Sequence, residues 1–273
     1  MNKRDSLQPK LEPPRGILHH RGVLPAPGYG RFLPSPTLAP FVEHFWTVSW
    51  DLGEPEIREV LPHPSIHMVI ERGGSAIVGL AQGRFTTRLE GRGRVLGTKF
   101  LPGGFRPFLG HSVSRLSGRR IPPQEVFGDG FLPLENQVLA MEDAADALAE
   151  IAAFLDSHRP PVDPKTDLAR RITQHAATDR SVTRVEQLAT EFGLTVRSLQ
   201  RLFAEYVGIS PKWVVQRYRL HEAAERIAHD EVTDWAALAL DLGYADQAHF
   251  IRDFRRLVGK TPSEYRRGFV EPG

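Results

Sequence analysis

Three side chains with the chemistry to read nucleic-acid bases lie within five residues of one another: Arg197, Gln200 and Arg201. Arginine can bond O6 and N7 of guanine through two N–H groups, and glutamine can pair with N6 and N7 of adenine. A helical projection places them opposite the apolar residues Leu199, Leu202, Phe203 and Tyr206. A second face of this kind carries Ala248, His249, Arg252 and Arg255, opposite Phe250, Phe254 and Leu257. Because such polar faces are usually only solvated, the interpretation depends on the elements that position them.

Those elements are duplicated. "LATEFG" (188–193) parallels "LALDLG" (238–243), and "RLFAEYVGISP" (201–211) parallels "RDFRRLVGKTP" (252–262). In each copy a phenylalanine, Phe203 or Phe254, stands five residues before the glycine of a Gly-x-Ser/Thr-Pro turn. Each copy therefore predicts a helix, a glycine turn and a second helix, which is a helix-turn-helix unit.

Local signals predict where these helices begin and end. We expect unit 1 at about 184–206 and unit 2 at about 234–258, joined by a long helix over 211–229. The predicted N-terminal signals are Thr183 with Glu186 as a capping box, Thr195, Pro211, Thr233, Asp246 and Pro262. Gly193 and Gly243 are the predicted helix stops.

The first half of the chain has a different pattern. Short β-rich runs at 41–50, 66–71, 75–90 and 94–102 are separated by Gly and Pro clusters, which predicts an antiparallel β-barrel or sandwich with flanking helices. A helical pattern follows at 134–158, and it suits packing against this barrel or against a second subunit. The overall expectation is an α+β chain whose C-terminal domain is all-α.

Three prolines within residues 159–164 predict a linker between two domains. We therefore divide the chain into a Pro-rich, disordered leader (1–30), a β-rich domain ending in a helix (31–158), the linker, and a helical domain (165–273).

Composition excludes several classes of protein. The 273 residues contain no cysteine, which excludes disulfides, zinc fingers and thiol nucleophiles and fits a reducing cytoplasm. No apolar run approaches the roughly 20 residues of a membrane span, and the first residues lack a signal-peptide pattern. The formal charge is 35 − 33 = +2: residues 1–164 have 18 basic and 18 acidic side chains, and residues 165–273 have 17 and 15. Bulk charge therefore does not decide whether the partner is DNA.

The helical region, about 165–269, resembles the DNA-binding domain of the AraC/XylS family of transcription regulators. The residues that match the family signature are Ala239, Gly243, Tyr244, Phe250, Phe254, Gly259, Pro262 and Tyr265. The resemblance implies seven helices in two helix-turn-helix subdomains. It also implies that both recognition helices enter successive major-groove segments on one face of double-stranded DNA.

The family's base-reading positions carry over to Arg197, Gln200, Arg201, Gln247, Ala248, His249 and Arg252. Ala248 replaces a residue that is often polar, and the projection places Gln247 near the buried side. Phosphate contacts are expected from Arg184, Lys212, Arg255 and Arg256. The near-neutral charge also requires Arg217 to share the DNA side with these basic residues.

The β-rich half fits the family's cupin-like N-terminal domain, which senses an effector or dimerises. Trp46, His67, Phe100 and Arg106 are the candidate ligand-binding residues, although the aromatic ones suit a simple core and Arg106 suits a salt bridge. The histidines at 44, 63, 67 and 111 include no His-x-His pair, so we expect neither a metal nor a cofactor.

The sequence thus predicts a cytoplasmic, sequence-specific transcription regulator that is not an enzyme. Its expected partners are DNA, a small-molecule effector, RNA polymerase and a second copy of the chain, with no membrane. An alkyl-transfer DNA-repair enzyme would need a cysteine, which is absent. A cupin-type metalloenzyme and a helical protein–protein adaptor are the remaining alternatives.

Overall fold

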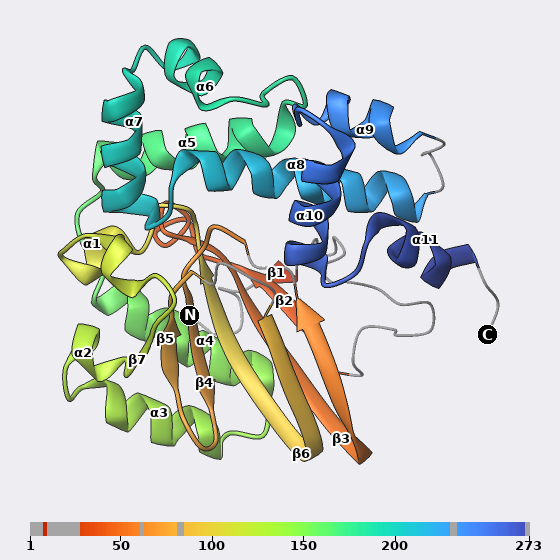
Figure 1. The fold of residues 1–273 in the computed structure, drawn as a ribbon. Coiled ribbons are helices and arrows are strands. Elements are labelled where there is room, and N and C mark those ends of the chain that lie inside the picture. Colours follow the sequence, from red (N-terminus) through yellow and green to blue (C-terminus); the bar gives the residue numbers. More distant parts are fainter. Residues whose placement is uncertain (1–7, 10–27, 61–62, 81–84, 230–233, 271–273) are drawn as a thin grey trace.

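The computed structural model describes residues 8–9, 28–60, 63–80, 85–229 and 234–270, and Figure 1 shows their arrangement. A β-sheet with helices against it is followed by a helical region that lies along the long helix α8 (Pro211–Ala228). No helix in these described ranges has the length and apolar character needed to cross a membrane. Most of the leader predicted for residues 1–30 lies outside the described residues; its Gln8–Pro9 pair forms a short strand.

All strands belong to one antiparallel sheet. They are β1 (Gln8–Pro9), β2 (Gly30–Leu33), β3 (Val42–Val60), β4 (His67–Glu71), β5 (Ala76–Val78), β6 (Phe85–Phe100) and β7 (Arg120–Ile121). Their order is β1-β2-β3-β6-β4-β5-β7, so the described strands leave two open edges at β1 and β7. The predicted antiparallel sheet is confirmed, but these strands form neither a closed barrel nor a two-sheet sandwich.

The sheet nevertheless curls, because the long β3–β6 ribbon bends back on itself. Val60 pairs with Phe85, whereas His67, seven residues later, pairs with Lys99. A straight strand from Phe85 to Lys99 would span about 46 Å, but the chain from Val60 to His67 reaches at most about 25 Å. The ribbon must therefore turn, and the register of β3 is irregular just after Leu52.

Two sequence-based strand boundaries were wrong at this bend. The glycine-rich run at 90–94 lies inside β6 instead of forming a turn, and β3 continues to Val60. A Cβ added at Gly93 would lie 2.2 Å from the ring of Trp50, and one at Gly97 would lie 2.0 Å from the ring of Trp46. These glycines therefore leave room for indole rings lying on the neighbouring strand, which is why glycine occurs in mid-strand.

Helices cover the other parts of the β-rich half: α1 (Arg106–Leu109), the 3₁₀ turn η2 (Val113–Leu116), α2 (Gln124–Phe127), α3 (Phe131–Ala140) and α4 (Ala144–Ser157). The single helix predicted at 134–158 is therefore two helices. Asp143 caps α4 by accepting a hydrogen bond from the N–H of Asp146, and Arg94 donates to the carbonyl groups of Val138, Met141 and Glu142 at the break. Both helices contact the sheet of the same chain, so the alternative of intramolecular packing is confirmed.

The helical region contains α5 (Pro164–Thr178), α6 (Val185–Glu191), α7 (Val196–Leu202) with a π-helical turn η3 (Phe203–Val207), α8 (Pro211–Ala228), α9 (Trp235–Asp241), α10 (Gln247–Val258) and α11 (Pro262–Val270). Thr195 caps α7 and Asp246 caps α10, as predicted. Two predicted caps were displaced by one residue. Gln187, not Glu186, accepts from the backbone N–H groups before α6, and Asp234 caps α9.

Buried residues divide the chain differently from the predicted linker. One core cluster runs from the sheet through α5, α6 and α7 to Val215, and a second, smaller cluster runs from Leu220 to Tyr265. Residues 159–163 lie between α4 and α5 without helix or strand. The first helix-turn-helix unit thus shares its core with the sheet, and the domain division at 159–164 stays a prediction.

The buried His44 predicts a pH-dependent stability. It is 5% exposed, and Arg31 donates to its Nδ1 at 3.2 Å. Burial lowers the pKa of His44 to about 4, with Glu43 opposing and the positive charges of Arg31 and Lys99 assisting. The neutral ring therefore contributes stability above pH 6.5 that is lost as the pH falls through 4. We expect the free energy of unfolding to fall by about 1–2 kcal/mol from pH 7 to pH 5 on its account.

Denaturant unfolding across that pH range measures this effect. The variant His44→Gln keeps an acceptor for Arg31 but cannot take up a proton, so its stability should change less with pH. An identical slope in both proteins would show that His44 does not control this dependence.

Candidate DNA-binding surface

The first recognition helix, α7, has one buried face and one exposed face. Leu199, Leu202 and Phe203 are buried in the larger core. The predicted base-reading side chains Arg197, Gln200 and Arg201 are all exposed, as is Ala204 one turn further. The predicted amphipathic division of this helix is therefore confirmed, whereas its role in reading bases stays a prediction.

The second recognition helix, α10, follows the same design in the smaller core. Phe250, Phe254 and Leu257 are buried. Gln247, Ala248, Arg252, Arg255 and Arg256 are exposed, so the projection that placed Gln247 near the buried side was wrong. Gln247 is the first residue of α10, directly after the Asp246 cap, and a side chain in the first turn can still point outward.

His249 is held by its own helix. Its Nε2 lies 3.5 Å from Oδ2 of Asp253, and its ring meets the ring of Tyr244 edge-on at 5.1 Å. The other carboxylate oxygen of Asp253 lies 3.2 Å from Arg256. The side chain of His249 is 43% exposed, while that of Asp253 is 12% exposed. His249 therefore has one ring nitrogen toward Asp253 and the other, Nδ1, remaining for a ligand.

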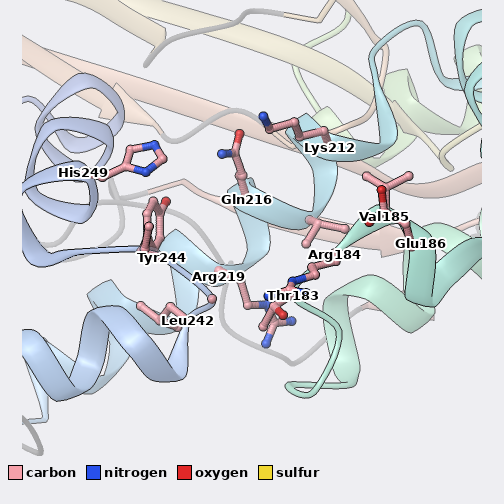
Figure 2. A pocket seen from close by; sticks show the side chains of 13 residues that line it. Thr183, Arg184, Val185, Glu186, Lys212, Gln216, Arg219, Leu242, Tyr244 and His249 are labelled. Atoms are coloured by element: carbon pink, nitrogen blue, oxygen red, sulfur yellow. The ribbon is translucent and has the colours of Figure 1, made fainter.

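A groove of about 370 Å³ separates the two units. Its walls are the start of α6, with Arg184, and the start of α10, with His249; its floor is α8. Figure 2 shows Lys212 and Gln216 on α8 and His249 across from them. Arg184 and Lys212 were expected here from the sequence, whereas Gln216 was not; it stands one helical turn after Lys212, and that spacing could have indicated it.

The basic residues expected to contact DNA are exposed, with one exception. Arg184, Arg197, Arg201, Lys212, Arg252, Arg255 and Arg256 are exposed. Arg217 is 2% exposed, and burial lowers its pKa to about 9. The expectation that Arg217 faces DNA was wrong, because it occupies the buried side of α8.

The two units touch each other directly at a glycine. Gly243 ends α9 with a φ of +79°, and a Cβ added there would lie 2.5 Å from Cβ of Thr183, just before α6. Gly193, the equivalent glycine of unit 1, has a φ of +64° and nothing within 4 Å of such a Cβ. Only the second glycine is therefore required by a close approach as well as by its backbone conformation.

The candidate ligand-binding residues of the N-terminal half do not form one group. Trp46 and His67 lie together with ring centroids 6.2 Å apart. Phe100 is fully buried and packs edge-on against Phe105. Arg106 forms an ion pair with Glu205 at 2.6 Å, as the salt-bridge interpretation predicted. Within the described part of the chain, no three His, Asp or Glu side chains gather as metal ligands.

The Arg106 pair belongs to a contact that sequence analysis missed. Ser112 donates to the carbonyl group of Ala204 at 2.9 Å, and Ser117 donates to that of Gly208. A Cβ added at Gly208 would lie 2.8 Å from Val113. The end of the first recognition helix and its "GISP" turn therefore rest on η2 of the N-terminal half.

Comparisons with known proteins match the chain in two parts. Residues 30–122 match a domain of unknown function, DUF6597, and residues 188–268 match a helix-turn-helix domain. The transcriptional activator RhaS of Escherichia fergusonii is 36% identical over 85 residues, which are 30% of this chain and 30% of that protein. An HTH-type transcriptional regulator of Haemophilus influenzae is 31% identical over 83 residues, 30% of this chain and 28% of that protein. The matches thus span less than a third of these relatives.

Solved structures are similar over longer stretches but at low scores. An AraC-type regulator domain from Chromobacterium violaceum shares 22% identity over 39% of this chain and 99% of that one, with a TM-score of 0.33. ToxT of Vibrio cholerae shares 11% identity over 84% of this chain and 99% of that one, with a TM-score of 0.36. TM-scores this low do not establish a common fold, so the assignment of the helical region depends on the sequence matches and on the geometry above. Residues 188–268 of this chain thus match a helix-turn-helix domain, preceded at residues 30–122 by a match to the DUF6597 family.

Proposed function

We propose that this protein is a sequence-specific, double-stranded DNA-binding transcription regulator. The observation that carries the proposal is that two helix-turn-helix units of the same scaffold each present an exposed polar face, on α7 and on α10. Both units pack against one helix, α8 (Figure 1). A pair of recognition helices held in this way suits two successive major-groove segments.

In this proposal Arg197, Gln200 and Arg201 read one segment, and Gln247, Ala248 and Arg252 read the other. His249 is partly withdrawn toward Asp253 and contributes at the edge of the second segment. Arg184, Lys212, Arg255 and Arg256 contact phosphates, since all four are exposed. Because Ala248 offers no hydrogen bond, the second helix reads fewer polar base edges than the first.

The N-terminal half would supply regulation instead of catalysis. Its contact with the end of α7 gives it a direct mechanical route to the first unit. Trp46 and His67, on the curled sheet, are the residues around which a small-molecule effector would bind. Dimerisation, contact with RNA polymerase and a cytoplasmic location complete the proposal, and they fit a transcription regulator.

Selection of bound sequences from a random DNA pool tests the DNA-binding function. The wild-type chain should select a site with two conserved parts. Arg201→Ala should lose preference in one part and Arg252→Ala in the other, at about 1–3 kcal/mol for each lost contact.

Arg88→Ala is the matched control, because the Arg88 side chain is 65% exposed on β6, which belongs to neither helix-turn-helix unit. It should select the same site as the wild type. Weakening that is uniform over all sequences would assign Arg201 or Arg252 to phosphate contacts, and a chain that selects no sequence would contradict the proposed function.

A further inference from the structure

The groove between the two units lies where a duplex spanning both recognition helices must cross the protein. We propose, building on the DNA-binding function above, that this groove is a third DNA contact, which takes the phosphodiester backbone between the two major-groove segments through Lys212, Gln216 and His249. The groove is thus assigned to a phosphate ligand, held mainly by α8, the helix that connects the units.

The groove lies between the two units, where the DNA backbone would pass. The groove has α6 of unit 1 on one side and α10 of unit 2 on the other, and Lys212 and Gln216 rise from α8 between them (Figure 2). Two successive major-groove segments on one face of B-DNA are separated by a minor groove and its flanking phosphates. A duplex docked on both α7 and α10 therefore brings backbone, not base edges, over α8.

The groove has an excess of basic side chains. Arg184 and Lys212 are exposed, and neither forms an ion pair with any residue in the described part of the chain. Arg219 also lines the groove, but its guanidinium faces Glu222 at 2.6 Å and is buried. Among the described residues that line the groove, Glu186 is the one acidic side chain. The groove is therefore cationic in a helical region whose net charge is only +2, so the positive charge is concentrated where phosphate would lie.

The groove also contains hydrogen-bond donors that suit a phosphate. Asp253 takes one edge of the His249 ring, so Nδ1 is the nitrogen left for the groove. Tyr244 is 7% exposed and lines the groove, and burial together with the nearby Asp253 carboxylate raises the pKa of its hydroxyl group. The ammonium of Lys212, the amide of Gln216 and the imidazole of His249 therefore line one groove, and each can donate a hydrogen bond to an anion. Asp253 acts here as a positioning residue for His249.

The experiment uses the full chain and its selected duplex, with single uncharged methylphosphonates placed in turn at each phosphate between the two conserved parts. At one or two positions the substitution should weaken wild-type binding about tenfold. Lys212→Ala should weaken binding to the unmodified duplex by a similar factor, and the same methylphosphonates should then cost little more. This non-additivity identifies a direct contact.

Lys165→Ala is the matched control, because Lys165 is an exposed lysine at the start of α5 that does not line the groove. It should retain the full sensitivity. Asp253→Asn should reduce sensitivity at the same phosphates through His249. Gln216→Ala, which changes no base-reading side chain, should reduce it while leaving the selected sequence unchanged, which a merely structural role would not do.

Equal sensitivity of Lys212→Ala and the wild type at every central phosphate would overturn the groove assignment while leaving the DNA-binding function in place. Failure of the chain to select any duplex would overturn both.

Discussion

Replacing Phe254 with alanine is expected to unfold the second helix-turn-helix unit while the sheet and the first unit stay folded. Phe254 is fully buried, with ring centroids 5.7 Å from both Phe250 and Tyr265. Removing a buried phenyl ring costs about 3–5 kcal/mol, through lost apolar contact and the cavity left behind. That cost is comparable with the whole stability of a small folding unit, which is about 5 kcal/mol at the low end.

The prediction of local unfolding comes from the division of the core. Phe254 belongs to the cluster that runs from Leu220 to Tyr265, and the described residues of this cluster are separate from those around the sheet. Phe203, the equivalent residue of unit 1, is equally buried but lies in the larger cluster that includes the sheet. The same substitution should therefore destabilise two different sets of elements.

Hydrogen exchange followed by mass spectrometry distinguishes the two outcomes. In Phe254→Ala, amide protection should fall in α9, α10 and α11 and persist in β3 and β6. In Phe203→Ala, protection should fall in α6, α7 and the sheet together. If Phe254→Ala lowered protection equally in every element, the two clusters would form one cooperative unit and the interpretation would be wrong.

Local signals made the helical region predictable. Thr195, Asp246 and Pro211 each act on the backbone within a few residues, so their effect can be read from the sequence alone. The repeat of Phe203 and Phe254 at a fixed distance from a glycine turn indicated which side of each recognition helix is buried. The two predicted caps that failed were displaced by a single residue, which is the usual uncertainty of a helix end.

Features that depend on distant contacts were not predictable. The glycines at 91 and 93 suggested a turn between two strands. Instead, Gly91 lies where the β3–β6 ribbon bends, and Gly93 leaves room for the ring of Trp50. The break between α3 and α4 is stabilised by Arg94, which is more than 40 residues away in sequence. Neither feature leaves a periodic signal.

The candidate site likewise combines features that local sequence predicts with features that depend on distant contacts. Exposed residues on α7 and α10 follow from helical spacing, whereas the groove joins Thr183, Lys212 and His249 from three separate segments. Arg217 shows the limit of reasoning from charge, since this arginine was expected to face DNA and is buried. Only the packing of α8 against its neighbours decides which of its basic side chains faces outward.

The contact between the two units leads to the second large effect, which is expected for Gly243→Ala. An alanine in the left-handed conformation costs about 1–2 kcal/mol in any turn. At Gly243 the new Cβ would also stand 2.5 Å from Cβ of Thr183, a backbone-anchored atom that cannot rotate away. The two units must then move apart, at a further cost of about 1–3 kcal/mol for overpacking.

Gly193→Ala is the internal control, because it has the same backbone conformation with open space around it. It should lose only the conformational part of the stability, measured by denaturant unfolding. Since the spacing of α7 and α10 depends on the Gly243 contact, Gly243→Ala should also weaken binding to the selected duplex by about tenfold or more, and Gly193→Ala far less.

A second substitution tests whether the close approach itself is the cause. Thr183→Gly removes the atom that the new Cβ would meet, so the double variant with Gly243→Ala should recover most of the lost affinity. Equal losses for Gly193→Ala and Gly243→Ala, or no recovery in the double variant, would mean that the turn conformation alone matters. The relative position of the two recognition helices would then be set by α8 and not by the contact between the units.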